Sequence, residues 1–99
     1  MTKVVWADSV LIDISQIYCY IALNSTENAD NFLNRLMDSA ENQLSVFPTI
    51  GRIIPELCDP AFREIIYGNY RIMYHFESNV VNITHVRHVA RKFINDGKP

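Results

Sequence analysis

Residues 63–76 read REIIYGNYRIMYHF, and residues 79–88 read NVVNITHVRH. In both stretches apolar residues alternate with polar or charged ones, which is the period-two pattern of a half-buried β-strand. Gly68-Asn69 separates two strand-like runs, and Ser78-Asn79 separates the next two. Residues of these types tolerate the positive φ that tight hairpin turns require. From about Phe62 onward the chain is therefore predicted to form two hairpins, which together make a three-stranded antiparallel meander.

The lengths of the two turns set the pairing register. If each loop has two residues, paired positions sum to 137 in the first hairpin and to 157 in the second. This register sorts the side chains onto two faces of the sheet. The helix face, so called because it is apolar enough to pack on helices, carries Ile65, Tyr67, Tyr70, Ile72, Tyr74, Phe76, Val81 and Ile83. The polar face, expected to be open to solvent, carries Glu64, Ile66, Arg71, Met73, His75, Asn82, Thr84, Val86 and His88.

The predicted polar face brings cationic groups together. In this register Arg71 pairs with Val86, and His88 lies diagonally from Arg71 at roughly 7–8 Å. An arginine and a histidine would then share one patch, where function is expected. The alternative interpretation is an ordinary wetted sheet face on which Glu64, also diagonal to Arg71, neutralises it. A bulge in either strand would change the outcome, because a one-residue slip sends every later side chain to the opposite face.

The first half of the chain is predicted to form a strand and then two helices. Lys3–Trp6 is rich in β-formers. Asp8 and Ser9 supply an N-cap for a helix that runs to about Leu23, with apolar residues at helical spacing. Residues 24–26 break this helix and offer a second cap signal, after which a longer apolar stripe follows. The positions of that stripe are Ala29, Phe32, Leu33, Leu36, Met37, Ala40, Leu44 and Phe47.

Pro48 ends the second helix, and residues 48–60, which also contain Gly51 and Pro55, are predicted to be a loop without a β-ladder. The expected fold class is α+β. An N-terminal strand precedes an antiparallel helix hairpin, and the antiparallel three-stranded meander then forms one sheet packed on the helices. At 99 residues the chain is predicted to be a single domain, 1–99, with a core over about 3–93 and a frayed tail over 94–99.

Composition excludes several classes of protein. The chain is 48% hydrophobic and 20% charged, and it has no apolar run near the ~18 residues that a membrane span needs. The N-terminus lacks the layout of a secretory signal, so a cytoplasmic location is predicted. Cys19 and Cys58 follow no metal-ligand spacing and are interpreted as free thiols. His85 and His88 fall on opposite faces of a strand, so we predict no zinc pair. No other metal and no cofactor are expected.

Charge is divided unevenly along the chain, although the net charge is only −2. Residues 1–50 hold two basic and six acidic side chains, a net of −4, whereas residues 51–99 hold seven basic and five acidic ones, a net of +2. All three histidines also lie in the second half. We therefore expect an anionic ligand or an acidic partner segment to meet the C-terminal half.

The order of these elements and several short motifs resemble the RelE/ParE family of bacterial toxins. The motifs are Phe47-Pro48-Thr49-Ile50-Gly51-Arg52, Pro55-Glu56-Leu57, Arg63-Glu64-Ile65-Ile66, Tyr70-Arg71-Ile72-Met73-Tyr74 and Val86-Arg87-His88-Val89-Ala90-Arg91. The resemblance covers Val4 to about Phe93. It implies the growth-inhibiting toxin of a type II toxin–antitoxin module. Its partner would be a small antitoxin that wraps the toxin and binds operator DNA, which the toxin meets only indirectly. A homodimer or a toxin–antitoxin heterotetramer is also implied, with no membrane partner.

Two activities divide this family. ParE-like members poison DNA gyrase and perform no known hydrolysis, whereas RelE-like members enter the ribosome and cut messenger RNA. If the chain is RelE-like, the resemblance implies that Arg71 holds the phosphate and that Glu56 takes the ribose 2′-OH proton. His88 would protonate the leaving 5′-oxygen, and Arg91 would add positive charge.

Three departures from the RelE-like pattern favour the ParE-like alternative. The basic loop of ribosome-dependent members is replaced by residues 51–56 with one cation, and no tyrosine follows Tyr74. A pI near 5.8 also suits an RNA-lined site poorly. In the ParE-like alternative the same sheet residues bind rather than catalyse. A third hypothesis is an inactive module whose polar face only receives an acidic, apolar antitoxin peptide. The predicted antitoxin- or target-binding residues are Arg71, Met73, Val86, His88 and Arg91.

Overall fold

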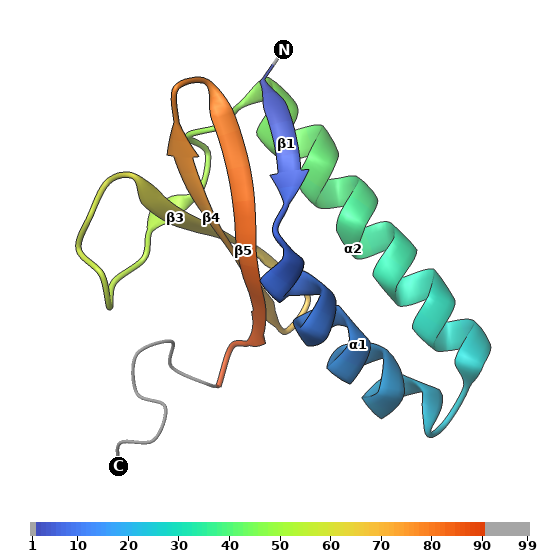
Figure 1. The fold of residues 1–99 in the computed structure, drawn as a ribbon. Coiled ribbons are helices and arrows are strands. Elements are labelled where there is room, and N and C mark those ends of the chain that lie inside the picture. The colour runs from blue at the N-terminus through green and yellow to red at the C-terminus, as the bar shows by residue number, and fades with distance from the viewer. Residues whose placement is uncertain (1, 91–99) are drawn as a thin grey trace.

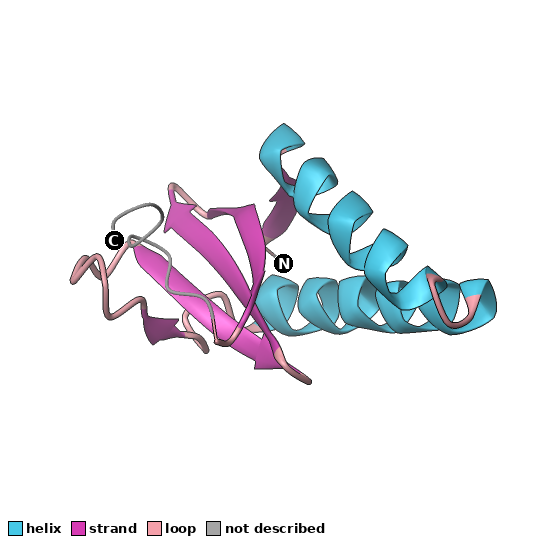
Figure 2. Ribbon diagram, turned by 90° about the horizontal axis from the view of Figure 1, so that it is seen from below, coloured by secondary structure: helices cyan, strands magenta, loops and turns pink. Residues whose placement is uncertain are grey.

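A computed structural model describes residues 2–90 of the chain. The elements follow the order β1 (Lys3–Trp6), α1 (Asp8–Ala22), α2 (Thr26–Val46), β2 (Arg52–Ile53), β3 (Phe62–Tyr67), β4 (Tyr70–Glu77) and β5 (Val80–His88). All five strands form one sheet in the order β1-β5-β4-β3-β2, and both helices lie on one side of it (Figures 1 and 2). The predicted α+β fold is confirmed. The end of the predicted core and the predicted tail fall on residues 91–99, outside the described residues.

The first strand joins the sheet at a distant place in the sequence. Lys3 pairs with Val80 and Trp6 with Ile83, so β1 runs parallel to β5 at one edge of the sheet. In Figure 1 β1 lies between α2 and β5. The sequence predicted this strand but not its neighbour, because alternation within a strand carries no information about which strand lies beside it.

The two helices begin in different ways. The residue before α1 is Ala7, which makes no side-chain cap, so the predicted cap by Asp8 and Ser9 is wrong. Ser9 instead donates its hydroxyl to the Thr84 carbonyl of β5 at 2.8 Å. α2 does carry the predicted type of cap, because Ser25 Oγ accepts the Asn28 N–H at 3.1 Å. Neither helix, nor any other within residues 2–90, is long and apolar enough to cross a membrane.

The hydrophobic core lies between the helix hairpin and the helix face of the sheet. Most of the predicted second-helix stripe is buried or half-buried, with Leu36, Ala40 and Leu44 all at 0% exposure. Phe47 is the exception: it follows the last residue of α2 and is 63% exposed, so its predicted place in the core is wrong. All eight residues predicted for the helix face belong to this core or pack against it. A hydrogen bond also links β1 to α2, because Trp6 Nε1 donates to the Glu41 carboxylate at 2.7 Å. Burial of these apolar side chains supplies most of the stabilisation of such a fold.

Residues 48–61 do more than connect α2 to the meander. Arg52 and Ile53 form β2, which pairs antiparallel with Glu64 and Arg63 of β3, so the predicted absence of a ladder is wrong. The prolines flank this short pairing and do not interrupt it, and a two-residue edge strand needs few donors. Beyond β2 the Ile54 side chain is buried against the sheet at 2% exposure. The connection therefore covers part of the polar face.

Both predicted turns are present. Gly68 has φ of 60°, and Ser78 and Asn79 have φ of 54° and 62°, as primed hairpin turns require. The first register is confirmed throughout, from Phe62 opposite His75 to Tyr67 opposite Tyr70. The second register is confirmed only for the pairs nearest the turn, as far as Tyr74 opposite Ile83.

A bulge then changes the second hairpin. The register shifts between Met73 and Tyr74, so that Met73 pairs with His85 and leaves Thr84 as the additional residue of β5. The Thr84 hydroxyl donates to the Met73 carbonyl at 3.3 Å across this irregularity. Every residue of β5 after Thr84 is therefore displaced by one position from its predicted partner and face.

Candidate functional site

The bulge separates the residues that the sequence predicted to share one patch. Arg71 pairs with Arg87 and not with Val86, which lies opposite Ile72 and belongs to the core at 2% exposure. His88 lies opposite Tyr70, a residue of the helix face. The prediction that Arg71 and His88 are diagonal neighbours on the polar face is therefore wrong. Strand alternation places them on opposite faces of the sheet.

Arg71 lies instead in a cluster of alternating charges on the polar face. Its Nε donates to Glu64 Oε1 at 2.7 Å, and its two terminal nitrogens donate to the two carboxylate oxygens of Glu56 at 2.8 and 3.0 Å. Arg52 lies 2.6 Å from the other Glu64 oxygen. Two guanidinium groups and two carboxylates thus balance in charge. The bidentate Arg71–Glu56 geometry is the strongest form of such a pair.

This cluster is buried, so the predicted open polar face is closed at its centre. The side chains of Arg71 and Glu64 are 6% and 0% exposed, and that of Glu56 is 17% exposed. Hydrogen bonding to Glu56 is the largest cause of the raised pKa of Arg71, and it outweighs the opposing effect of burial. Arg71 is therefore a permanent cation. Glu56 already accepts one N–H from each terminal nitrogen, so an external phosphate would have to compete with its carboxylate there.

Buried hydrogen bonds hold the connection that carries Glu56 against the sheet. The Tyr74 hydroxyl accepts the Gly51 N–H at 3.0 Å and donates to the Pro48 carbonyl at 2.8 Å. Arg63 donates to the Gly51 carbonyl and to the Pro60 carbonyl, each at 3.0 Å. Burial is the main reason that the pKa of Tyr74 is raised. These contacts hold residues 48–61 against the sheet at both ends of the segment. The position of Glu56 within it is therefore set by the fold.

A Cβ atom at position 51 would meet two of these groups. It would lie 2.6 Å from the Glu64 carbonyl oxygen and 2.7 Å from the Tyr74 hydroxyl. Gly51 is therefore the residue that lets the connection approach the sheet closely. The sequence showed this glycine but gave no indication of what it approaches.

A largely apolar cavity lies beside the charge cluster. Met73, only 1% exposed, contributes to a cavity of about 390 Å³. The other residues that line it are Ile54, Leu57, Asp59, Phe62, Thr84 and His85. Met73 and Val86, predicted to share a binding face, are thus on opposite sides of the sheet. The bulge is again the reason.

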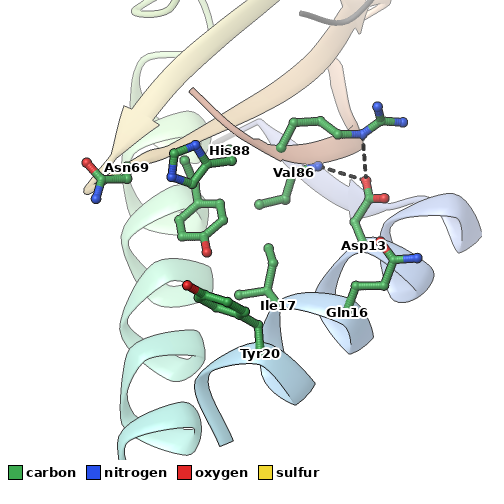
Figure 3. Close-up of a pocket in the computed structure, with 9 residues that line it drawn as sticks. Asp13, Gln16, Ile17, Tyr20, Asn69, Val86 and His88 are labelled. Atoms are coloured by element: carbon green, nitrogen blue, oxygen red, sulfur yellow. Dashed lines mark hydrogen bonds and ion pairs between the residues drawn. The ribbon is translucent and has the colours of Figure 1, made fainter. Parts of the chain in front are cut away.

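His88 borders another cavity, which we call the α1–β5 cleft, on the other side of the sheet (Figure 3). Its volume is about 470 Å³. The imidazole meets the Tyr70 ring edge-on, with 5.5 Å between ring centroids. The pKa of Tyr70 is raised, mainly by burial and also by the neighbouring Tyr20. The residues that line the cleft are Asp13, Gln16, Ile17, Tyr20, Asn69, Tyr70, Val86, Arg87 and His88.

Asp13 is the functional residue that sequence reasoning missed. Its carboxylate accepts the Val86 N–H at 3.0 Å, where β1 no longer covers the edge of β5. The same oxygen lies 3.5 Å from His85 Nδ1 and 3.7 Å from Arg87 Nε. One signal was available, because Asp13 interrupts the apolar stripe of α1 next to Ile14 and four positions before Ile17. A carboxylate on a packed helix face needs a partner.

The remaining predicted site residues have simpler positions. His85 and His88 lie on opposite faces, as predicted, and Cys19 and Cys58 are exposed free thiols. Within residues 2–90 no group of three or more His, Cys, Asp or Glu side chains could hold a metal ion. Arg91 lies outside the described residues. Of the four residues predicted for catalysis, Arg71 and Glu56 are in contact and His88 is not with them.

Comparisons with known proteins agree on one kind of relative. A family model described as ParE toxin of type II toxin–antitoxin system, parDE, matches residues 4–93. Toxin RelE2 of Caulobacter vibrioides is 33% identical over 92 residues, which cover 92% of this chain and 99% of that relative. A structure of the chromosomal ParDE toxin–antitoxin system from P. aeruginosa superposes with a TM-score of 0.72 and covers 90% of this chain and 97% of that one. At 17% identity this last likeness shows the fold alone.

Proposed function

Because this chain belongs to the RelE/ParE family of type II toxin–antitoxin toxins, we propose that it inhibits growth by binding DNA gyrase and not by cutting RNA. Its partner is the cognate antitoxin of the module. The proposal concerns the molecular target, on which the two kinds of family member differ.

The observation that carries the proposal is the state of Arg71. RNA cleavage requires a cation that meets a phosphate, a base near the ribose 2′-OH and an acid near the leaving oxygen. Here both terminal nitrogens of Arg71 are engaged by Glu56, which is also the only predicted base. The predicted acid, His88, is on the other face of the sheet. A neutralised cluster of this kind supports a structural role for Arg71 and Glu56, and it supports a toxin that acts by binding.

The second candidate is messenger RNA cleavage in the RelE-like manner. The name of the Caulobacter relative, Toxin RelE2, favours it. For this activity the connection that carries Glu56 would have to move, so that a phosphate replaces the carboxylate on Arg71. The third candidate, an inactive antitoxin-binding module, would need no such movement. As binding residues, Arg71, Met73, Val86, His88 and Arg91 remain proposals in all three cases.

Induction of the chain without its antitoxin distinguishes the three candidates. Growth, DNA breaks and integrity of messenger RNA are followed in parallel, and gyrase supercoiling is measured with purified protein. We expect growth arrest with DNA breaks, inhibited supercoiling and intact messengers. Codon-linked cleavage of messengers would overturn the gyrase target, and normal growth with folded, expressed protein would leave the inactive module.

A single variant sharpens this experiment. Glu56→Gln keeps the shape and one acceptor oxygen but cannot take a proton, and Glu27→Gln on the exposed start of α2 is the matched control. If the chain binds gyrase through its folded surface, both variants keep the toxicity of the wild type. Loss of toxicity in Glu56→Gln alone, with an unchanged unfolding midpoint, would favour the cleavage mechanism.

A further inference from the structure

Within the connection between β2 and β3, residues 55–60 form a loop whose two ends meet. The Ile54 N–H donates to the Phe62 carbonyl at 3.0 Å, so the chain leaves the sheet and returns to it at one place. At the returning end Asp59 accepts the Phe62 N–H with its carbonyl and the Ala61 N–H with its carboxylate, each at 2.9 Å. A loop with joined ends is a compact unit. It can open locally while the strands at its base stay paired.

The tip of this loop is a strained turn that is bonded mainly to itself. Cys58 has φ of 51°, in the left-handed region that residues other than glycine rarely adopt. The N–H groups of Leu57 and Cys58 both donate to the Ile54 carbonyl, at 3.0 and 3.1 Å, and the Cys58 thiol donates to the Pro55 carbonyl at 3.3 Å. A left-handed cysteine persists only while the contacts around it hold. Opening of the tip would relieve that strain.

Two cavities border the loop. Leu57 and Asp59 line the apolar cavity of about 390 Å³ that Met73 shares. Pro55 and Glu56 line another of about 400 Å³, which we call the charged cavity. The other residues that line the charged cavity are Arg52, Ile66, Arg71 and Val89. The loop thus separates two spaces on one side of the sheet, and it has room to move that a close-packed segment would lack.

Glu56 is the polar side chain of the tip that reaches the sheet within residues 2–90. It holds both terminal nitrogens of Arg71, yet at 17% exposure it is the least buried member of that pair and of Glu64. If Glu56 withdraws, Arg71 keeps its Nε bond to Glu64 at 2.7 Å, and Glu64 keeps its contact with Arg52. Water from the charged cavity can then replace the carboxylate. One contact can therefore be released while the other three charged groups stay together.

We propose that residues 55–60 are a latch with a closed and an open state, and that the Glu56–Arg71 contact is the catch that keeps Arg71 covered. In the open state the loop turns about its joined ends, Cys58 leaves the left-handed region, and the two cavities join above Arg71 and Met73. The three charged groups that remain, two guanidinium groups and one carboxylate, then carry a net charge of +1 beside an apolar surface. The structure holds the closed state. The latch is independent of which target the toxin binds.

Native-state hydrogen exchange of the full chain tests whether the latch opens by itself. The amides of Leu57 and Cys58 report on the tip, because both donate to Ile54, and the amide of Ile72 in the central strand β4 reports on global unfolding. After correction for intrinsic rates, we expect the two tip amides to exchange about tenfold or more faster than Ile72 and to depend less on added urea. Tip amides that exchange together with Ile72, with the same dependence on urea, would overturn the proposal.

Two pairs of variants test the catch and the strain separately. Glu56→Gln should speed exchange at Leu57 about fivefold, because the ion pair is broken in the open state, whereas Glu27→Gln on the exposed start of α2 should leave it unchanged. Cys58→Asn should slow it about threefold relative to Cys58→Ala, since both lose the thiol and asparagine tolerates the left-handed backbone.

Each pair can overturn the proposal. Exchange at Leu57 that is unchanged in Glu56→Gln would mean that the loop opens without uncovering Arg71, and the catch would be refuted. Equal exchange in Cys58→Asn and Cys58→Ala would mean that the left-handed turn persists in the open state, and the latch motion would be refuted. If Glu56→Gln does not fold, the Cys58 pair decides, because Cys58 is exposed.

Discussion

Glu56, on the connection between β2 and β3, holds both terminal nitrogens of Arg71 on β4 at 2.8 and 3.0 Å. The pair is almost enclosed, with Arg71 at 6% and Glu56 at 17% exposure. Such a contact is costly to break from one side, because the remaining charge stays buried. The Arg71–Glu56 contact therefore links the stability of the sheet to the position of the segment between β2 and β3.

Arg71→Ala is expected to be strongly destabilising. It leaves the Glu64 carboxylate, which is 0% exposed, with Arg52 as its remaining ion-pair partner among the described residues. Loss of about 3–5 kcal/mol of unfolding free energy is expected, whereas Glu56→Gln should cost only about 1 kcal/mol. Urea unfolding measures both, with Arg35→Ala on the exposed surface of α2 as the control. Equal losses for Arg71→Ala and Arg35→Ala would contradict the structural role of the cluster.

Tyr74→Phe removes one hydroxyl that serves two backbone groups. The Gly51 N–H loses its acceptor and the Pro48 carbonyl loses its donor. A loss of about 1–3 kcal/mol is expected, because a buried donor is left unsatisfied. Amide exchange at Gly51 should become faster than in the wild type. Unchanged exchange at Gly51 would mean that the hydroxyl does not hold the connection.

The same tyrosine predicts a dependence of stability on pH. The pKa of Tyr74 is raised in the folded protein, mainly by burial, so the folded state keeps its phenolic proton to higher pH than the unfolded state. Stability from this group is complete below the ordinary tyrosine pKa of about 10 and is lost as the pH rises above it. Unfolding midpoints measured from pH 8 to pH 11 should fall less steeply in Tyr74→Phe than in the wild type. Parallel curves would count against a buried, protonated Tyr74.

Gly51→Ala should loosen the connection without removing any polar group. The added methyl would lie 2.6 Å from the Glu64 carbonyl oxygen, a backbone atom of the sheet that has little freedom to move. Overpacking of this kind costs about 1–3 kcal/mol. Thermal unfolding compared with Thr49→Ala, an exposed position two residues earlier, isolates the steric effect. A Gly51→Ala variant as stable as Thr49→Ala would show that the connection can move away from the sheet.

Asp13→Ala is expected to weaken the edge of β5. The Val86 N–H loses the carboxylate that accepts it at 3.0 Å, at a cost of about 1–3 kcal/mol. Asp13→Asn retains an acceptor oxygen and should cost less, and Asp38→Ala on the exposed surface of α2 should cost little. Amide exchange at Val86 reports the local effect. Protection of Val86 that survives in Asp13→Ala would mean that another group caps this edge.

The fold could be predicted further from the sequence than the site could. Local chemistry determines the turns, since Gly68, Ser78 and Asn79 adopt the positive φ that their positions require. The alternation of apolar and polar residues determines which side chains lie on the helix face, as far as Ile83 in β5. The bulge at Thr84 could not be predicted, because a single additional residue leaves the apolar pattern on either side intact.

The site depended on contacts between segments that are distant in the sequence. Arg71 was recognised, but the closure of its surroundings by Glu56 and Glu64 depends on how residues 48–61 fold back over the sheet. Asp13 was missed because its partner is a backbone N–H exposed only where β1 ends. Both cases are tertiary effects, for which spacing along the chain contains no signal.

The parallel pairing of β1 with β5 has a consequence for how the chain acquires its structure. Lys3 and Val80 are neighbours, as are Thr2 and Asn79, 77 positions apart in the sequence. Closing so long a loop is entropically costly, so the first strand is expected to find its place only after the last one has been synthesised. A nascent chain that ends before Val80 should then lack the assembled sheet, which far-ultraviolet circular dichroism of a fragment ending at Asn79 would reveal. The first residues to leave the ribosome would thus be among the last to reach their final neighbours.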